Sequence, residues 1–426
     1  MPKVAKLKNG FNFINILMPG TKAVTVLVLF PVGSRFEDKQ ISGASHFVEH
    51  MMFKGTKKRP DHLEISRELD AVGADYNAFT YKDYTGYYVK VDTSKAELAF
   101  DLLSDIVFNS TISEAEVEKE KGVIVEELRM YEDNPTMAID LLFDALMFGD
   151  HPLGWDIGGT TESVRGMTRD NLWKYYKKYY SPANAVLVVA GNLESKKLKK
   201  LLGHFTSIPG SAKQKAWSGF SGFSWPKNSL PLNDRVRVKE RKLDQAHLLM
   251  GFPGLSYKDK KLYAASVMLN ILGGGMSSRL FVEVREKRGL AYMVRASMGS
   301  FRDCGVAQIQ AGLDPVRLKE ALATINKEVK RIASEMVTVR ELKDAKSSLI
   351  GRLALALEDS GVQAERTAKQ FWFFPKVENF AETKKKIQAV TIKEIQQVAK
   401  ELFDQKQMRL AVIGPLNKEK VLNCLK

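Results

Sequence analysis

The chain has 426 residues, of which 44% are hydrophobic and 27% charged, and its net charge is +15. This composition is ordinary for a globular protein, and no uninterrupted apolar run reaches the roughly 18 to 20 residues that span a bilayer, which excludes a class built on membrane helices. Two cysteines, Cys304 and Cys424, are too few for a disulfide framework, and the length exceeds what one hydrophobic core usually organises.

The N-terminal residues and the positive charge limit which cellular compartment and which partners we expect. The first ten residues lack the apolar core of a secretory signal and the Arg/Ser-rich composition of a transit segment, so we expect a cytoplasmic setting, with a mature organellar form as the alternative. The basic clusters lack the stacked aromatics of a nucleic-acid platform. The run Trp173 to Tyr180 does interleave lysines with aromatics, but we expect its rings to pack inside the protein. No nucleic-acid partner and no membrane partner are therefore expected.

In chain order, a strand-like run at residues 23–30 precedes the most informative motif, H-x-x-E-H at residues 46–50. At 3.6 residues per turn, His46 and His50 lie on one helix face with Glu49 beside them. Neutral imidazole is a preferred zinc ligand, and a nearby carboxylate can take a proton from water. With six histidines in the chain, a chance match has odds of roughly one in two hundred. The alternative is a helix whose histidines only border a core.

Two histidines leave a catalytic zinc site one ligand short, because such sites usually have three protein ligands and a water. The next helical pattern, residues 113–130, begins with a capping box at Ser113 and Glu116 and carries a stripe of carboxylates. Glu120 and Glu127 lie two turns apart in this stripe. Glu126 points about 100° away, and spacing alone does not decide between Glu126 and Glu127 as the third ligand.

The second half of the sequence repeats the end of the first half. Residues 167–173 and 185–193 match residues 390–396 and 408–416 at one common offset, 390 − 167 = 408 − 185 = 223. Each copy is a helix followed by a buried strand and a glycine turn, which indicates a duplicated fold. The second copy lacks a two-histidine helix, since His247 is the sole histidine after His204. Residues 207–233 mix Gly, Ser, Pro and Lys without periodicity and are predicted to be a linker.

The second copy also contains a glycine-rich loop at residues 273–276, followed by an amphipathic helix that Gly289 is expected to stop. The loop lacks the Lys-Ser/Thr of a phosphate-binding loop, so a nucleotide site is not expected. A further long helix is predicted over residues 316–332. Together with the strand patterns of both copies, these helices predict an α+β fold for each unit.

These motifs together resemble the pitrilysin-type inverzincin metallopeptidases, and more closely their half-length branch, which is like the mitochondrial processing peptidase. The resemblance is carried by PVGSR at 31–35, GASHFVEHMMFKGT at 43–56, NAFT at 77–80, EKGVIVEE at 120–127, GGGMSSRL at 273–280 and residues 285–292. It therefore covers most of the chain. It implies two homologous αβ-roll domains, each a mostly antiparallel sheet backed by helices: residues 1–210 with the metal motif, a linker at 211–233, and residues 234–426.

The resemblance also implies a role for each metal-site residue. It makes His46, His50 and Glu127 the ligands of one zinc ion per chain and Glu49 the general base. Glu120 matches a carboxylate that supports the site from outside the ligand set, as partners of metal ligands commonly do.

Four further residues match positions that contact substrate in this family. Asn77 and Ala78 match a segment that pairs with the backbone of an extended peptide, although Asn77 alone would read as a turn residue. Arg285 and Tyr292 match an Arg/Tyr pair. Tyr292 suits hydrogen bonding to an oxyanion and Arg285 suits anchoring of substrate. Without the resemblance, Arg285 would read as a surface charge.

We therefore expect a zinc-dependent endopeptidase that hydrolyses short or unfolded peptides inside a chamber. In the family two half-length chains enclose this chamber, and because this chain carries both the metal set and the Arg/Tyr pair, a homodimer is expected, with a heterodimer as the alternative. Two other classes compete: a non-catalytic scaffold or partner-dependent subunit of the same fold, and a basic nucleic-acid-binding protein.

Overall fold

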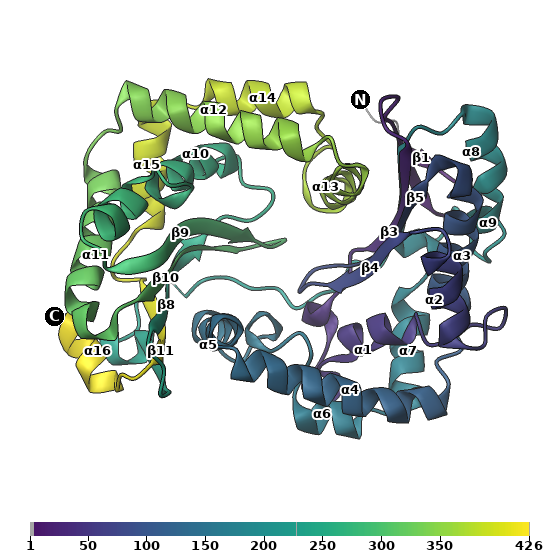
Figure 1. Ribbon diagram of the computed structural model, residues 1–426, viewed down its shortest axis with the longest axis horizontal. Coiled ribbons are helices and arrows are strands. Elements are labelled where there is room, and N and C mark those ends of the chain that lie inside the picture. Colours follow the sequence, from purple (N-terminus) through teal and green to yellow (C-terminus); the bar gives the residue numbers. More distant parts are fainter. Residues whose placement is uncertain (1–3, 227, 426) are drawn as a thin grey trace. The chain divides into compact units, whose positions relative to one another are not determined.

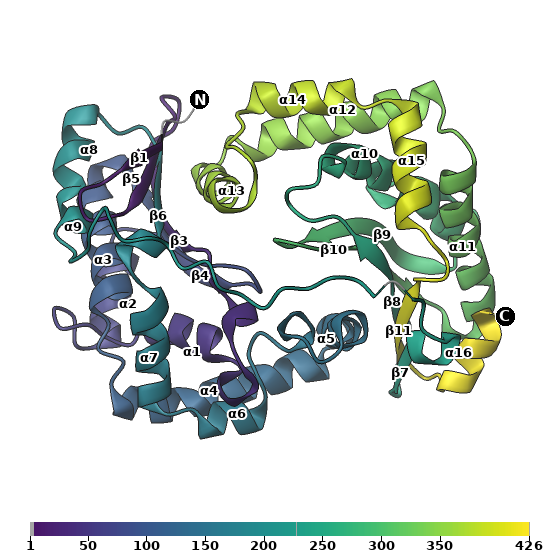
Figure 2. The ribbon, with the colours of Figure 1, turned by 180° about the vertical axis from the view of Figure 1, so that it is seen from behind.

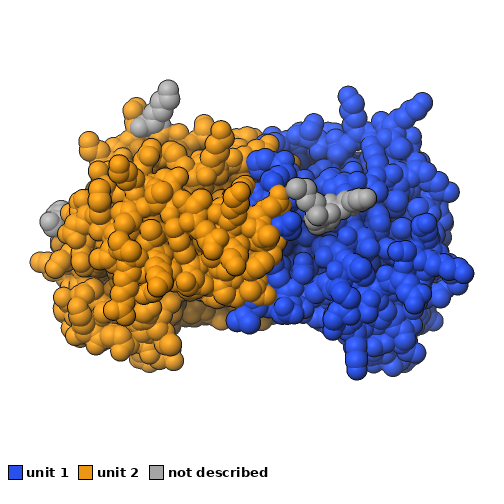
Figure 3. Space-filling view, turned by 90° about the horizontal axis from the view of Figure 1, so that it is seen from above, with its two compact units in different colours: residues 1–129, 155–221, 355–379 blue, residues 130–154, 222–354, 380–426 orange. Residues whose placement is uncertain are grey.

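The computed structural model describes residues 4–226 and 228–425. The chain forms two compact units (Figure 3), and each unit draws on both halves of the sequence. Unit 1 consists of residues up to 129, 155–221 and 355–379, and unit 2 of residues 130–154, 222–354 and 380 onward. One crossing, at residues 221 and 222, falls inside the segment expected to be a linker. The division into domains 1–210 and 234–426 stays a prediction about which segments fold independently.

Unit 1 is built on a six-stranded sheet in the order β1-β2-β6-β3-β5-β4 (Figures 1 and 2). The β2–β6 pair is parallel and all other pairs are antiparallel. The strands are β1 (Val4–Lys6), β2 (Asn12–Leu17), β3 (Ala23–Phe30), β4 (Asp75–Thr80), β5 (Thr85–Asp92) and β6 (Val186–Gly191). The predicted strand at residues 23–30 is confirmed, and it lies in the middle of the sheet because both of its faces are apolar.

Helices cover both faces of this sheet. Val24, Val26 and Val28 of β3 point into a core shared with α3, whereas the intervening Thr25 hydrogen-bonds Ser360 of α13 with 2.8 Å between hydroxyl oxygens. Successive strand residues face opposite sides, so α13 covers the second face. The helices of unit 1 are α1 (Ala44–Met51), α2 (His62–Asp70), α3 (Ala96–Asn109), α4 (Glu114–Asp133, continuing into unit 2), α6 (Thr161–Gly166), α7 (Arg169–Tyr179), α8 (Ser195–Leu201), α9 (Gly203–Thr206) and α13 (Ser360–Phe373).

Unit 2 has a five-stranded sheet in the order β7-β11-β8-β10-β9, with one parallel pair, β7–β11. Its strands are β7 (Val236–Glu240), β8 (Ala246–Gly254), β9 (Ala291–Ser300), β10 (Gly305–Leu313) and β11 (Arg409–Gly414). Its helices are α5 (Pro135–Phe148), α10 (Leu262–Gly273), α11 (Leu318–Ser334), α12 (Val339–Ala356), α14 (Phe380–Ala389), α15 (Ile392–Leu402) and α16 (Lys418–Leu425), with a π-helix at Phe281–Glu286. Gly289 follows this π-helix with a φ of +60°, where the sequence predicted the stop.

In unit 2, α5 has the place that α13 has in unit 1. Leu249 of β8 and Ile413 of β11 form a small core with Ile139 and Phe143 of α5, on the face opposite the main core. A Cβ on Gly251 would lie 2.2 Å from the ring of Phe143, so this glycine lets helix and sheet approach closely. Each sheet is thus completed by a helix from the other half of the sequence.

The predicted duplication is confirmed throughout the fold. At the offset of 223 the start of β3 falls on the start of β8, that of β6 on β11 and that of α7 on α15. The helices α5 and α13 begin 360 − 135 = 225 residues apart. The expected α+β class, two mostly antiparallel sheets backed by helices, is therefore correct.

Candidate metal centre

The helix that carries the H-x-x-E-H motif, α1, is held at its N-terminus by a buried carboxylate. Glu37 accepts hydrogen bonds from the backbone N–H groups of Gly43 and Ser45, both at 2.7 Å. Gly43 has a φ of +95°, and a Cβ there would lie 2.5 Å from the carbonyl oxygen of Gly158. The start of α1 therefore requires a glycine and an acceptor, and both fix the direction in which the helix projects its side chains.

One face of α1 is apolar and packs in the core, and the other face carries the polar motif residues. Phe47, Val48 and Met51 are buried in the core of unit 1. His46 and His50 lie on the other face, where 13% and 19% of their side chains are exposed. The helix packs against α7 and β4, which fixes this orientation. The interpretation that the histidines only border the core does not account for what faces them.

Facing the histidines is the α4 carboxylate that spacing could not select. Glu127 lies beside both imidazoles, whereas Glu126 is 69% exposed and pairs with Arg129 at 2.6 Å. The helix begins one residue after Ser113, whose hydroxyl accepts from the N–H of Glu116 at 3.4 Å. The structure thus brings together His46, His50 and Glu127.

The distances among these donors suit a tetrahedral ion. The two Nε2 atoms are 3.3 Å apart, and Oε2 of Glu127 lies 3.4 Å from His50 Nε2 and 3.7 Å from His46 Nε2. A tetrahedron with zinc–ligand bonds of about 2.0 to 2.2 Å has edges of about 3.3 to 3.6 Å, since its edge is about 1.6 times that bond. Three lone-pair donors at this spacing repel one another unless a cation or proton lies among them. The residues therefore fit a divalent ion such as zinc.

Two side chains outside the donor set, Glu120 and Lys54, orient His50. Its Nδ1 donates to Oε1 of Glu120 at 2.9 Å, and Oε2 of Glu120 is 2.7 Å from the ammonium of Lys54. Glu120 is 3% exposed. Burial raises its pKa, but the hydrogen bonds from His50 and Lys54 outweigh this and leave the pKa below its usual value. Glu120 is thus an ionised carboxylate next to a ligand candidate, the arrangement that fixes an imidazole for metal binding.

The two histidines have opposite protonation behaviour in the metal-free protein. Burial, and then the charge of His50, lowers the pKa of His46 to about 4. Burial also lowers the pKa of His50, but hydrogen bonds to Glu120 and Glu127 outweigh it and raise the value to about 9. At neutral pH His46 is therefore neutral and His50 carries one additional proton, with which a divalent ion would compete.

Glu49 lies outside the donor set, on α1 between the two histidines, and contacts β4 through Thr80. Burial raises its pKa, opposed by a hydrogen bond that its Oε2 accepts from Oγ1 of Thr80 at 2.5 Å. A partly desolvated carboxylate next to a metal site is suited to accept a proton. Sequence reasoning did not single out Thr80 or Lys54. Lys54 lies four residues after His50, beyond the end of α1, and Thr80 ends the NAFT motif, so no helical spacing pointed to either residue.

The residues expected to contact substrate lie on an edge strand in unit 1 and near one in unit 2. Asn77 and Ala78 are in β4, which pairs only with β5 among the described strands and so leaves one edge free. In unit 2, Nη1 of Arg285 donates to the carbonyl oxygen of Tyr292 at 2.8 Å, and its guanidinium lies 5.1 Å from that ring. Tyr292 is 75% exposed, a high value for a tyrosine.

The second copy has no donors at the corresponding positions. An offset of 223 places Leu269 at the position of His46, Gly273 at that of His50 and Ile350 at that of Glu127. Leu269 and Gly273 are buried in α10. Among the described residues, the cluster in unit 1 is the group of three close His, Cys, Asp or Glu side chains.

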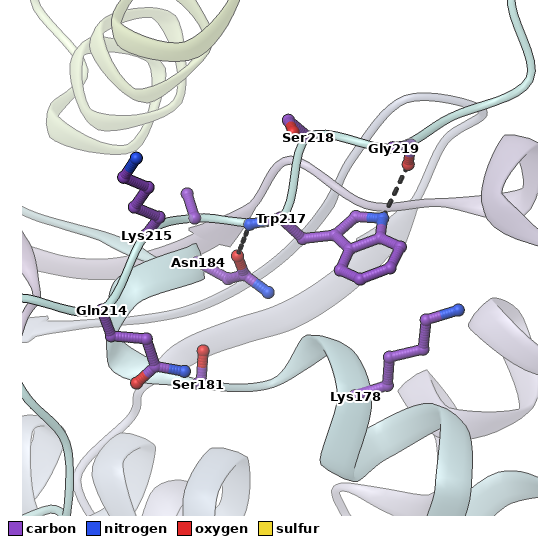
Figure 4. Close-up of a pocket in the computed structure, with 9 residues that line it drawn as sticks. Lys178, Ser181, Asn184, Gln214, Lys215, Trp217, Ser218 and Gly219 are labelled. Atoms are coloured by element: carbon purple, nitrogen blue, oxygen red, sulfur yellow. Dashed lines mark hydrogen bonds between the residues drawn. The ribbon is translucent and has the colours of Figure 1, made fainter.

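A separate pocket of about 300 Å³ in unit 1 has different chemistry (Figure 4). The Trp217 backbone N–H donates to Asn184 at 2.5 Å and its indole N–H donates to Gly219 at 2.6 Å. The lining includes no histidine or carboxylate and is therefore no metal site: Lys178, Ser181, Asn184, Gln214, Lys215, Ala216, Trp217, Ser218 and Gly219. The first of these hydrogen bonds ties Trp217 to the short helix Pro182–Asn184 that follows α7. As expected, Tyr175, Tyr176, Tyr179 and Tyr180 of the aromatic run are buried.

The fold and the donor cluster define a two-unit α+β protein with a candidate divalent-metal centre in its first unit. Comparison with known proteins agrees. A family model described as insulinase, peptidase family M16, matches residues 14–161, and one described as peptidase M16 inactive domain matches residues 166–349. The chain belongs to peptidase family M16, which confirms the resemblance to the pitrilysin-type enzymes.

Relatives cover nearly the whole chain. A protein of Streptomyces coelicolor described as an uncharacterized zinc protease is 36% identical over 96% of this chain and 89% of its own length. The uncharacterized zinc protease YmxG of Bacillus subtilis is 35% identical over 96% and 97%. Among solved structures, a protease from Helicobacter pylori has a TM-score of 0.85 at 24% identity, over 97% of this chain and 99% of that one, and shares the fold.

Within the described residues, no helix combines the length and apolar character needed to cross a membrane.

Proposed function

We propose that the protein is a zinc-dependent endopeptidase that cleaves short or unfolded peptides. The observation that carries this proposal is the set of three donors 3.3 to 3.7 Å apart with Glu49 beside them, in a chain that belongs to family M16. His46, His50 and Glu127 would hold one zinc ion per chain. The relatives that are named zinc proteases support the same chemistry.

The chain's own residues have distinct roles in the proposed reaction. Zinc bound at this site would polarise a peptide carbonyl and lower the pKa of bound water from 15.7 toward about 7. Glu49 would accept the proton of the attacking water and return it to the leaving amine. Glu120 would keep the imidazole of His50 oriented, because its carboxylate holds the Nδ1 proton.

Substrate binding is proposed to depend mainly on hydrogen bonds between the backbone of the peptide and the backbone of β4. The free edge of β4 at Asn77 and Ala78 would pair with an extended peptide and so add a strand to the sheet. The N–H of Ala78 donates to Oδ1 of Asn77 at 2.9 Å, and a peptide carbonyl would replace that acceptor. Arg285 would anchor substrate, and the exposed phenol of Tyr292 would donate to the oxyanion of the tetrahedral intermediate. In half-length family members this pair arrives from a partner chain, so we propose a homodimer with composite sites, with a related subunit as the alternative partner.

The test of the proposal is the isosteric variant Glu49→Gln. It keeps all three donors, so zinc stoichiometry should remain one per chain, while turnover of an unstructured peptide should fall by on the order of 100-fold or more, because a general base contributes about 10²- to 10⁴-fold. Wild-type protein whose cleavage survives removal of zinc by a chelator, or full activity of Glu49→Gln, would refute it. A scaffold subunit of the same fold would show no cleavage in either form.

A further inference from the structure

The strand expected to receive substrate also contacts the proposed general base. Thr80 is the last residue of β4, and its hydroxyl donates to Oε2 of Glu49 at 2.5 Å. Ala78 and Thr80 lie two residues apart and so face the same side of the sheet, toward α1. The backbone of β4 at Asn77 and Ala78 and the carboxylate of Glu49 are thus joined through one short stretch of chain.

Other hydroxyl groups near Glu49 are engaged elsewhere. The phenols of Tyr87 and Tyr180, whose ionisation is opposed by the charge of Glu49, hydrogen-bond each other at 2.8 Å. Among the described residues, Thr80 is therefore the side chain whose hydroxyl holds the Glu49 carboxylate. A glutamate side chain has three rotatable bonds, so a carboxylate that nothing holds would lose rotamer entropy each time it is fixed in one position.

We propose that Thr80 is a positioning residue that fixes the carboxylate of Glu49 and links it to the strand on which a peptide would pair. This inference rests on the proposed function. A general base must lie within hydrogen-bond reach of the proton that it takes, and a misplacement of about 1 Å costs on the order of 100-fold in rate. A peptide added to the edge of β4 would restrain the backbone of Thr80, so the base would be best ordered when substrate is bound.

Thr80→Val provides the main test, because valine has the shape of threonine without the hydroxyl. We expect kcat to fall by about 10- to 100-fold, part of what a positioned base contributes, while KM changes by less than about 3-fold and one zinc per chain is retained. Thr80→Ser keeps the hydroxyl and should recover most of this loss. Thr85→Val is the matched control: Thr85 pairs with Thr80 across the same strands, but its hydroxyl donates to the carbonyl of Val32.

A structural readout separates this inference from the proposed function. The crystal structure of metal-free Thr80→Val should show the Glu49 carboxylate in a different rotamer from wild type, whether or not the protein cleaves peptides. An unmoved carboxylate, unchanged kcat in the valine variant, or equal losses in the valine and serine variants would overturn the role of Thr80. If the valine variant does not fold, Thr80→Ala is compared with Thr80→Ser by the same criteria. Wild-type protein without zinc-dependent cleavage would instead reject the proposed function.

Discussion

Lys54 shows how a residue outside the donor set can act on the candidate metal centre. It follows His50 by four residues, and its ammonium is 2.7 Å from Glu120, whose other oxygen accepts from His50. Because the lysine keeps Glu120 ionised, Glu120 in turn makes the imidazole a stronger donor through Nε2. The charge of Lys54 therefore reaches the metal position through two hydrogen bonds.

We predict that Lys54→Met lowers zinc affinity by about 10-fold, at the lower end of the effect of losing partners of metal ligands, without removing any donor. Competition with a chromophoric chelator measures this affinity. Lys57→Met is the control, since Lys57 is exposed and lies three residues further on. Equal affinities in Lys54→Met and wild type would show that Glu120 needs no lysine.

At this scale the motif spacing predicted that two histidines share a helix face, whereas the choice of Glu127 over Glu126 came only from the family resemblance. The H-x-x-E-H spacing placed His46 and His50 on one face of α1, as the structure has them. Glu126 and Glu127 differ by 100° of rotation about α4, and only the packing of α4 against α1 decides which one faces the histidines. Thr80 was not predicted because its hydrogen bond joins a strand and a helix 31 residues apart.

Among the elements, α1 depends most on a single buried acid. Glu37 is the acceptor for two N–H groups at the start of this helix. Burial raises its pKa to about 7, although hydrogen bonds from Ser45 and Gly43 oppose the shift. The folded protein therefore holds a proton on Glu37 in a pH range where the unfolded chain, with a value of 4.5, has lost it.

This difference predicts how stability depends on pH. The contribution of protonated Glu37 is fully present below pH 4.5 and is lost as the pH rises to about 7, so the free energy of unfolding should fall through this window. Relative to Glu37→Gln, which cannot titrate, wild type should lose about 2 to 3 kcal/mol between pH 5 and pH 8, at about 1.4 kcal/mol per pKa unit. Urea unfolding of the metal-free proteins at the two pH values measures it. A constant difference between wild type and variant would contradict the prediction.

Element boundaries were predictable where the pattern is local. The nearly continuous apolar run of β3 and the threonine cap of α7 appear in the sequence. The helix predicted at 316–332 is α11, residues 318–334. The partners of α5 and α13 were not predictable in this way. The helix α5 is mostly apolar and α13 is amphipathic, and which sheet each covers depends on contacts with strands distant in the chain.

Each unit of the molecule contains one helix from the other half of the sequence. The face of the unit 1 sheet that carries Leu27 and Leu29 is covered by α13, whose Ala364 and Ala368 are fully buried. A fragment that ends in the expected linker lacks this helix. Its apolar sheet face would then be open to water or to other molecules.

We predict that residues 1–210 expressed alone bind a hydrophobic dye and show little near-UV circular dichroism, whereas co-expression with a peptide of residues 355–379 restores a folded complex. Near-UV circular dichroism and dye fluorescence measure both states. The same peptide with Ala364→Asp is the control, because a charge at this buried position prevents packing. A fragment 1–210 that is fully folded without the peptide would show that the consecutive domain is autonomous.

Mixing of inactive subunits tests the proposed composite sites. Glu49→Gln keeps Arg285, and Arg285→Ala keeps the metal set, so a mixed dimer would contain one complete site. Random mixing makes half of the dimers mixed, each with one of two sites, and should recover about a quarter of wild-type activity. Unfolding and refolding the two variants together, followed by a peptide-cleavage assay, measures this. No recovery would indicate that each chain uses its own Arg285.

The reciprocal placement of α5 and α13 means that neither copy of the repeat is complete alone. A single copy would have one sheet and one such helix, and the helix that covers the second face of its sheet would have to come from another copy. The duplicated chain supplies both copies in one polypeptide. One copy can therefore lack metal donors while both remain necessary, because each supplies the helix that the other needs.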